Sequence, residues 1–342
     1  MQISADNKTC DSVAPPAASL QSNLQSWRRL EHRRILIHLI HMNMPNEQNY
    51  SRRFTLDNLD IRGQVVRLTD VWRDMRISRH YPANIKQFLG EMAAVAVLVG
   101  AGLKQPGRAS LQIQRKPDHT GTGAIYTGPL AVVDCTDGLA VRGMSEADFK
   151  NGAASFAEWV EGCTLAMTLT YANTTQIYQS IVPVSGLSVA ECFEHYFDQS
   201  EQLPTHLWLA ANESGAGALL LQKLPNADLK DADGWARVEQ LAASVSEADL
   251  TALPAAQLLT RLFHEEDVRL FEAKPVSYAC KRDPQKVDNM LRSLGREEVE
   301  ATLAELGYVE VKDDICNQVY RYDRDAVTRL FAQSPANPVV KK

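Results

Sequence analysis

The sequence has 342 residues, of which 36 are lysine or arginine and 42 are aspartate or glutamate, so its formal net charge is -6. This mildly acidic balance gives no electrostatic basis for binding nucleic acid, and no nucleic-acid partner is expected. Hydrophobic residues make up 45% of the chain, enough for real cores in about two domains. The six cysteines are sparse and irregularly spaced, unlike a secreted disulfide scaffold, which favours a cytoplasmic protein.

The longest uncharged apolar run covers only residues 92–103. Twelve residues of helix are too short to cross a hydrocarbon layer about 30 Å thick, so we expect a buried helix and no membrane partner.

Residues 1–49 differ in texture from the rest of the chain. They open polar and rich in alanine and proline, and Arg28, Arg29, Arg33 and Arg34 then precede a short apolar stretch. A secretory signal has its basic residues near the start and ends in a small-residue cleavage site, and neither feature is present. We expect a disordered or wrongly assigned extension, with a basic amphipathic targeting helix as the alternative.

Residues 50–225 predict one α+β domain. Pro82 is suited to the start of a long apolar helix that continues through Val99. From 109 to 184 apolar residues alternate with polar ones between turn residues, which is typical of strands. Ser188 then has Glu191 three residues on, the capping-box spacing that begins a helix.

Residues 226–275 are predicted to be a helical linker. Near its end an apolar stripe must pack on something, because a bare stripe promotes aggregation. The stripe is formed by Leu258, Leu259, Leu262 and Phe263.

Residues 276–335 predict a small C-terminal module, and 336–342 a tail. Gly295 separates two amphipathic helices, and 308–311 and 319–322 form a predicted hairpin. About sixty residues give a marginal core, so a staple of some kind is expected.

Four long stretches of this chain, in the right order, resemble the 33-kDa chaperonin family (heat-shock protein 33). They are YFDQSEQLPTHLWLA at 196–210, GAGALLLQKLP at 215–225, LLTRLFHEEDVRLFEAKPV at 258–276 and MLRSLGREEVEATLAELGYVEV at 290–311. The resemblance covers about 50–332. It implies an α+β core, a linker and a C-terminal redox-switch module. The implied function is that of an ATP-independent holdase, which binds unfolding proteins through apolar surface and dimerises when active.

The family binds one zinc ion through four cysteines of the C-terminal module, arranged C-x-C and C-x-x-C. At the matching positions this sequence has Cys280, Arg282, Asp313 and Cys316. Arginine has no lone pair to offer a metal and carries a permanent positive charge. We therefore expect a degenerate site without zinc or any other cofactor, in which Arg282 forms an ion pair with Asp313.

The two remaining thiols leave two interpretations open. If the backbone keeps the family geometry without the metal, Cys280 and Cys316 lie close enough to form a disulfide. That bond would cross-link two parts of the module and stabilise it, unlike the two local disulfides of the family. The alternative is a pair of leftover thiols that pack as small hydrophobic side chains.

The expected function is a holdase with an impaired zinc and redox switch and no enzymatic activity. Clients would bind apolar surface near Leu258, Leu259, Leu262 and Phe263. The alternative is a binding or regulatory module that keeps the fold but no longer acts as a chaperone. A thiol redox enzyme is disfavoured because neither Cys280 nor Cys316 has a C-x-x-C partner.

Overall fold

The computed structural model describes residues 48–115, 131–145, 160, 163–182, 184, 188–280 and 282–332. The predictions for the N-terminal extension up to residue 47 and for the tail at 336–342 lie outside these residues.

The first sheet has five antiparallel strands in the order β10-β1-β2-β9-β8. Most side chains of β1, β2 and β9 are buried, so the sheet has apolar residues on both faces. The strands are β1 (Asn49–Leu56), β2 (Ile61–Leu68), β8 (Thr205–Ala211), β9 (Ala216–Lys223) and β10 (Val268–Pro275).

The second sheet has six strands in the order β11-β5-β4-β3-β6-β7. Neighbouring strands are antiparallel except for the β11–β5 pair, which is parallel. The strands are β3 (Gly107–Arg115), β4 (Ala131–Thr136), β5 (Ala140–Ser145), β6 (Cys163–Tyr171), β7 (Ile177–Val182) and β11 (Ser277–Tyr278).

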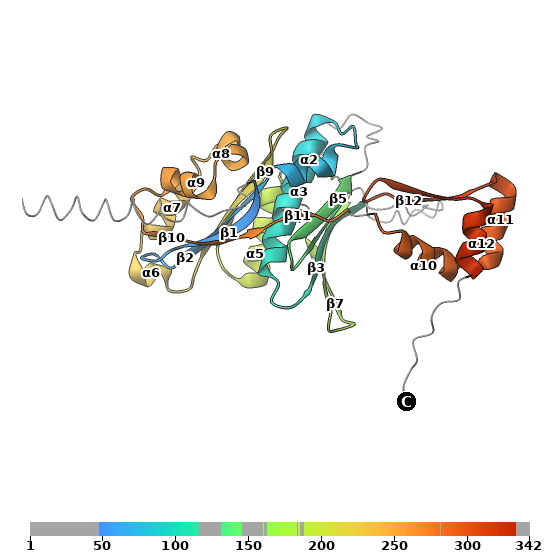
Figure 1. Ribbon diagram of the computed structural model, residues 1–342. Coiled ribbons are helices and arrows are strands. Elements are labelled where there is room, and N and C mark those ends of the chain that lie inside the picture. Colours follow the sequence, from blue (N-terminus) through green and yellow to red (C-terminus); the bar gives the residue numbers. More distant parts are fainter. Residues whose placement is uncertain are drawn as a thin grey trace, which may run out of the picture. The chain divides into compact units, whose positions relative to one another are not determined.

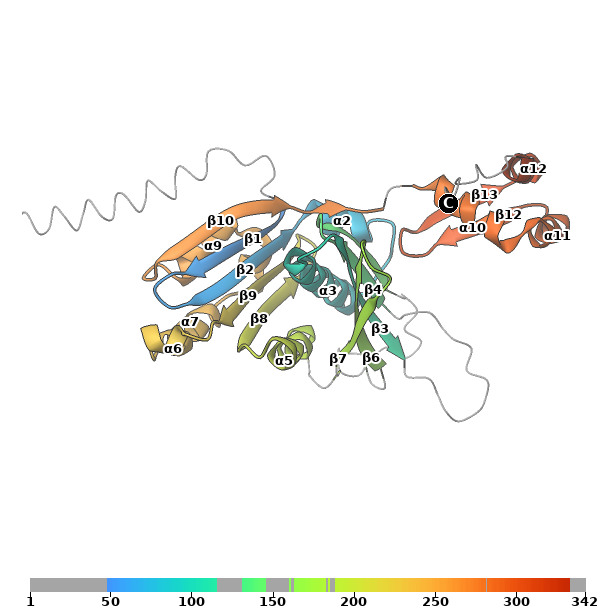
Figure 2. The same ribbon diagram turned by 90° about the horizontal axis from the view of Figure 1, so that it is seen from below.

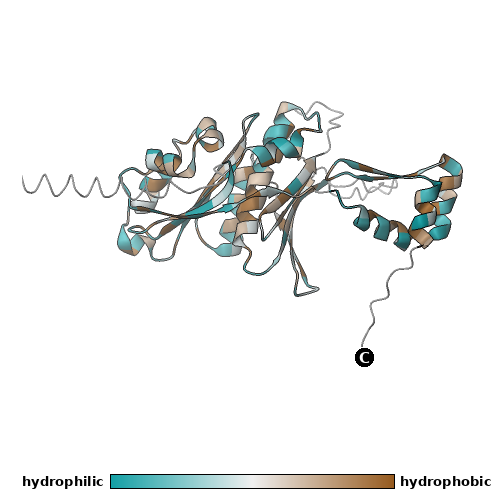
Figure 3. Cartoon of the chain, viewed as in Figure 1, coloured by the Kyte–Doolittle hydropathy of each residue, from teal (hydrophilic) through white to brown (hydrophobic). Residues whose placement is uncertain are grey.

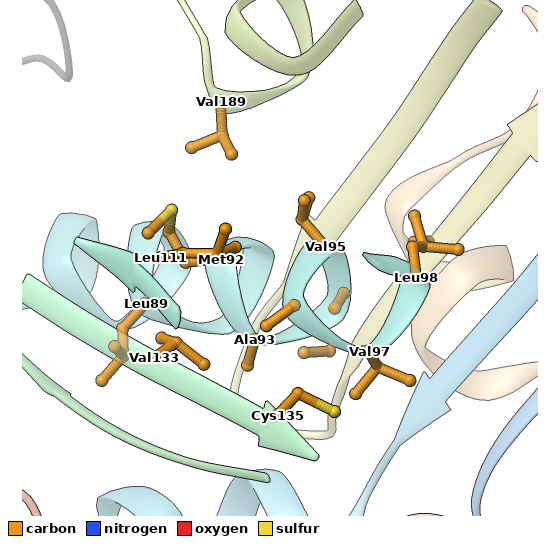
Figure 4. Close-up of a cluster of buried hydrophobic side chains, with 14 of the residues drawn as sticks. Leu89, Met92, Ala93, Val95, Val97, Leu98, Leu111, Val133, Cys135 and Val189 are labelled. Atoms are coloured by element: carbon orange, nitrogen blue, oxygen red, sulfur yellow. The ribbon is translucent and has the colours of Figure 1, made fainter. Parts of the chain in front are cut away.

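A long helix, α3 (Ala83–Gly102), lies between the two sheets (Figure 2). Pro82 precedes it, as the sequence predicted, and most of its residues are buried, the apolar ones in one large cluster with residues of both sheets. Figure 4 shows the part of this cluster where α3 meets Leu111, Val133 and Cys135. Gly90 permits a close approach, because a Cβ there would overlap Ala211 of β8. By length and composition α3 could cross a membrane, but 78% of its apolar window is buried, so it is the core helix.

Six further helices lie among the described residues of this part of the chain. Helix α5 begins at the predicted Ser188, whose side chain accepts a hydrogen bond from the Glu191 N–H at 3.2 Å. The helices are α2 (Asp70–Arg76), α5 (Val189–Glu201), α6 (Ala227–Lys230), α7 (Gly234–Ala242), α8 (Glu247–Ala252) and α9 (Ala255–Leu262).

The linker is helical only as far as α9. Residues 268–275, predicted to be helical, form the edge strand β10, which pairs with β1. Val268 and Leu270 are half-buried and Arg269 between them is exposed. This period-2 pattern is too short to indicate a strand directly after a segment with a helical pattern. Pro275 ends the strand at a sheet edge, where no ladder hydrogen bond is lost. Residues 277–278, predicted to open the C-terminal module, form β11 against β5.

The C-terminal module has its own small core, with helices packed against a two-stranded hairpin. Its elements are α10 (Pro284–Leu294), α11 (Arg296–Leu306), β12 (Val309–Asp313), β13 (Gln318–Tyr322) and α12 (Arg324–Ala332). Gly295 separates the helices at φ +97°, a backbone conformation suited to glycine. Hydrophobic and hydrophilic residues alternate along these helices (Figure 3), as one-sided packing requires. The chain is thus an α+β protein, as predicted.

Candidate functional site

Cys280 and Cys316 form a disulfide, the first of the two interpretations that the sequence left open. Their Cα atoms are 5.3 Å apart and 36 positions separate them in the chain. Cys280 follows β11, and Cys316 lies in the turn of the β12–β13 hairpin. Figure 1 labels β11 and β12, the strands that precede the two cysteines. A cross-link between residues 36 positions apart lowers the conformational entropy of the unfolded chain, and this stabilises the folded module by about 4 kcal/mol.

Two polar side chains hold the backbone at the two cysteines. Asp313 Oδ1 accepts a hydrogen bond from the Cys316 N–H at 3.1 Å. Gln318 Nε2 donates to the carbonyl oxygen of Cys280 at 3.0 Å. Asp313 therefore replaces a family cysteine with an acceptor that fixes the hairpin turn, and Gln318 joins β13 to the segment that carries Cys280.

The predicted ion pair between Arg282 and Asp313 is wrong. Among the described residues Arg282 forms no ion pair; its Nη2 donates to the Val319 carbonyl at 3.0 Å, and its guanidinium lies over the Tyr320 ring. The expectation failed because it considered only opposite charges, whereas a planar guanidinium also stacks on aromatic rings.

Tyr320 is a second centre of this network. Its hydroxyl accepts a hydrogen bond from the Asp283 N–H at 3.0 Å and donates to Gln318 Oε1 at 2.9 Å. Asp283 in turn caps α10 by accepting from the Lys286 N–H at 3.1 Å. The start of α10 is thus joined to β13 through one tyrosine.

The family's zinc ion does not fit the residues at these positions. Both thiols are used in the disulfide, Arg282 is cationic, and Asp313 is engaged with the backbone. No group of three or more His, Cys, Asp or Glu side chains suited to a metal ion occurs in the described part of the chain.

The predicted client-binding residues lie inside the structure. Leu258, Leu259, Leu262 and Phe263 are each at most 2% exposed. They belong to a cluster on the five-stranded sheet that is separate from the cluster around α3. The Phe263 ring lies 6.2 Å from that of Phe54 on β1, measured between centroids. As expected for a stripe that must be covered, α9 shields apolar residues of the sheet.

Polar contacts fasten the linker helices to the sheet. The Tyr50 hydroxyl of β1 accepts a hydrogen bond from the Ala255 N–H, the first residue of α9, at 2.7 Å. His206 of β8 stacks on Trp235 of α7 and lies 3.1 Å from Glu239 of the same helix. On its other side His206 Nδ1 lies 3.5 Å from Glu194 of α5.

Glu194 is itself unusual because it is partly buried. Burial raises the pKa of its carboxyl group, although the hydrogen bond from the Leu207 N–H and the nearby His206 oppose this. The carboxyl group of Glu194 thus connects α5 to β8. Through His206, which also contacts Glu239, it is connected to helix α7 of the linker.

Several of these residues carry no recognisable signal in the sequence. Tyr320 and Gln318 appeared only as hairpin positions, and His206 and Trp235 lie 29 positions apart in different elements. Nothing local indicates that Arg79, after α2, reaches the hairpin turn, yet its Nη2 donates to the carbonyl oxygens of Asp314 and Ile315.

Comparisons with known proteins point to one family over most of the chain. The family model described as "Hsp33 protein" matches residues 49–323. The 33 kDa chaperonin of Chromobacterium violaceum is 40% identical over 292 residues, covering 85% of this chain and 96% of the relative. That of Methylobacillus flagellatus is 36% identical over 294 residues, covering 85% and 97%.

The fold also matches a solved structure, that of the 33 kDa chaperonin (HSP33) from Thermotoga maritima. The TM-score is 0.67 at 20% sequence identity, with 83% of this chain and 98% of that chain covered. Since the family model matches most of the chain and the curated relatives are matched almost from end to end, the chain belongs to the Hsp33 family.

Proposed function

We propose that this protein is an ATP-independent holdase, which binds unfolding proteins through apolar surface and so prevents their aggregation. Relatives at 36–40% identity are named 33 kDa chaperonin, which supports a chaperone role. Client binding of this kind is non-covalent, so the proposal assigns no enzymatic activity and no catalytic residue.

One observation carries the proposal: the linker helices cover an apolar face of the five-stranded sheet. Removing α9 would expose the stripe at 258–263 and, beneath it, sheet residues such as Phe54 and Leu219. An apolar patch of this size binds other apolar surfaces, including those that unfolding proteins expose.

The cover is attached in a way that permits release. No cysteine of α7, α8 or α9 cross-links them to the sheet, since these helices contain none. Their attachments include packing, the Tyr50–Ala255 hydrogen bond, the His206 contacts, and the hydrogen bonds that Asn212 donates to Glu247 and Thr251 of α8. Contacts of this kind open at a moderate cost in free energy, which heat can supply.

We further propose that the zinc-dependent switch of the family is impaired, because Arg282 and Asp313 occupy two of the four ligand positions. No cofactor is then required. The expected setting is the cytoplasm, with unfolded proteins as partners, a homodimer as the active form, and neither nucleic acid nor membrane as a partner.

The test is an aggregation assay without ATP. Several unrelated proteins are unfolded by heat or dilution from denaturant, and light scattering is followed with and without the purified full chain. A holdase suppresses the scattering of most of them at near-stoichiometric amounts. Suppression of none, or of a single one, would instead favour a binding or regulatory module that is no longer a general chaperone.

A further inference from the structure

The turn of the β12–β13 hairpin, residues 314–317, lies against the loop that follows α2. We call these four residues the hairpin tip. Arg79 Nη2 donates to the carbonyl oxygens of Asp314 and Ile315, the latter at 3.1 Å. In return Asn317 Nδ2 donates to the carbonyl oxygen of Ser78 at 3.1 Å. All three acceptors are backbone carbonyls and two of them belong to the tip, so these contacts require a fixed tip backbone.

The tip backbone has the shape of a tight turn. Asn317 has φ +50°, a left-handed conformation that asparagine tolerates better than most residues. The bond from the Cys316 N–H to Asp313 supports the same turn. Loss of this shape would misplace the carbonyl groups that Arg79 binds.

The disulfide joins this tip to a segment that is already fixed on the core. Cys280 comes two residues after β11, which pairs with β5, and the Ala279 N–H still donates to the Val141 carbonyl at 2.8 Å. The core therefore holds the tip from two sides, through Ser78 and Arg79 and through β11 and the sulfur–sulfur bond.

We propose that Cys280 and Cys316 form a redox site whose disulfide fastens the C-terminal module to the core, and whose reduction releases the hairpin tip from Ser78 and Arg79. Its effect on chaperone activity rests on the proposed function: the oxidised form is the docked, less active state. This effect of oxidation is the opposite of the one that the family resemblance implies, in which oxidation unfolds the module.

The chemistry needs only a mild two-electron oxidant and a dithiol reductant. Oxidation removes two electrons and two protons from the two thiols and forms one sulfur–sulfur bond. With hydrogen peroxide as oxidant, the oxygen–oxygen bond breaks and two water molecules result. A dithiol reverses the step by thiolate attack on one sulfur, leaving both cysteines reduced and the reductant as a disulfide.

The arrangement of the cysteines explains why oxidation should have the opposite effect in this chain. With one cysteine left at each former pair, no local disulfide can form within 280–282 or 313–316, so oxidation joins the two segments. Both cysteines are partly exposed, whereas Cys135, Cys163 and Cys192 are at most 6% exposed. Burial raises the pKa of the Cys135 thiol to about 12, which keeps it protonated and unreactive.

The experiment compares the full chain after hydrogen peroxide treatment and after reduction with dithiothreitol, by amide hydrogen exchange and mass spectrometry. Peptide mapping first establishes the Cys280–Cys316 link in the oxidised sample. We expect reduction to accelerate exchange at least tenfold in peptides that cover 76–81 and 312–318, and to leave the α3 peptides unchanged. Equal exchange at 76–81 in both samples would overturn the proposal.

Two variants separate the bond from the docking. The double variant Cys280→Ser with Cys316→Ser should resemble the reduced protein under both conditions. Arg79→Ala should keep the disulfide, yet exchange quickly at the tip when oxidised. If instead Arg79→Ala leaves the tip as protected as in the parent, the contacts with Arg79 are not what holds the module.

Light scattering on the same samples gives the functional consequence. We expect the reduced protein to suppress aggregation at several-fold lower concentration than the oxidised protein, and the reverse order would overturn the assigned sign. If neither form suppresses aggregation, the proposed holdase function fails, while the exchange data still decide whether the disulfide docks the module.

Discussion

The guanidinium of Arg282 lies over the ring of Tyr320, with its Cζ atom 4.8 Å from the ring centroid. Arg282 occupies a position where the family has a zinc-binding cysteine, and Tyr320 is a buried residue of β13. A cation stacked on an aromatic face thus joins two segments that a metal joins elsewhere in the family. The arginine does not contact the residue at the other substituted zinc position, Asp313. It contacts Val319 and Tyr320 of β13 instead.

The Arg282–Tyr320 contact should be measurable as a coupling energy. In a double-mutant cycle with Arg282→Ala and Tyr320→Leu, urea unfolding of the oxidised protein should give about 0.5–2 kcal/mol of coupling. Tyr320→Phe retains the ring and should preserve most of that coupling, although it loses the hydroxyl bonds with Asp283 and Gln318. A coupling of zero within error would show that the two side chains are neighbours without interaction.

Restoring the missing cysteines should restore a metal site. The double variant Arg282→Cys with Asp313→Cys recreates C-x-C and C-x-x-C with Cys280 and Cys316, and four thiolates form a closed tetrahedral zinc site. Purified under reducing conditions, it should contain about one zinc per chain by elemental analysis. The matched double variant with serine at both positions should contain none. A metal-free four-cysteine variant would mean that the backbone no longer has the family geometry.

The sequence predicted those elements whose cause is local. Pro82, Ser188 and Gly295 each mark a helix end by their own backbone or side-chain chemistry, and each prediction was confirmed. Strand β10 was missed because its pairing partner, β1, lies over 200 residues earlier and determines its conformation.

The candidate site was predictable only in part. The pairing of Cys280 with Cys316 followed from the family arrangement, as one of two open interpretations. The partners of Arg282 could not be predicted from the sequence, because they depend on which face of β13 lies against the arginine. The contact between Arg79 and Asp314 spans 235 positions, and no pattern in a single sequence indicates it.

Weakening the cover over the sheet should increase chaperone activity. Leu258 is a fully buried residue of α9, so Leu258→Ala should destabilise the packing of this helix on the sheet by about 2–5 kcal/mol. Displacement of the linker then becomes easier, and suppression of light scattering should begin several degrees lower than for the parent. Binding of a fluorescent apolar dye should rise over the same temperature range.

A matched control lies one residue away. Gln257 is exposed on the same helix, so Gln257→Ala should change neither the onset temperature nor dye binding. Equal activity of the two variants, despite the lower stability of Leu258→Ala, would indicate that clients bind elsewhere.

A buried carboxyl group in the core helix should make stability depend on pH. Burial raises the pKa of Glu91 from its ordinary 4.5 to about 7, while a hydrogen bond from Gln87 at 3.0 Å opposes this and the nearby Glu247 adds to it. Between these values the folded protein holds a proton that the unfolded chain has released. The contribution of Glu91 to stability therefore falls as the pH rises from about 4.5 to 7, by up to about 3 kcal/mol, and stays low above.

Glu91→Gln tests this dependence, because glutamine matches the shape of the protonated acid and does not ionise. In urea unfolding the variant should be close to the parent at pH 5 and about 1–3 kcal/mol more stable at pH 8. Glu265→Gln is the control, since its side chain is 82% exposed, and it should show no such divergence. A constant difference between Glu91→Gln and the parent across this range would mean that Glu91 is already ionised in the folded protein at pH 5. The buried helix between the sheets would then accommodate a charge, and burial would not raise the pKa of Glu91.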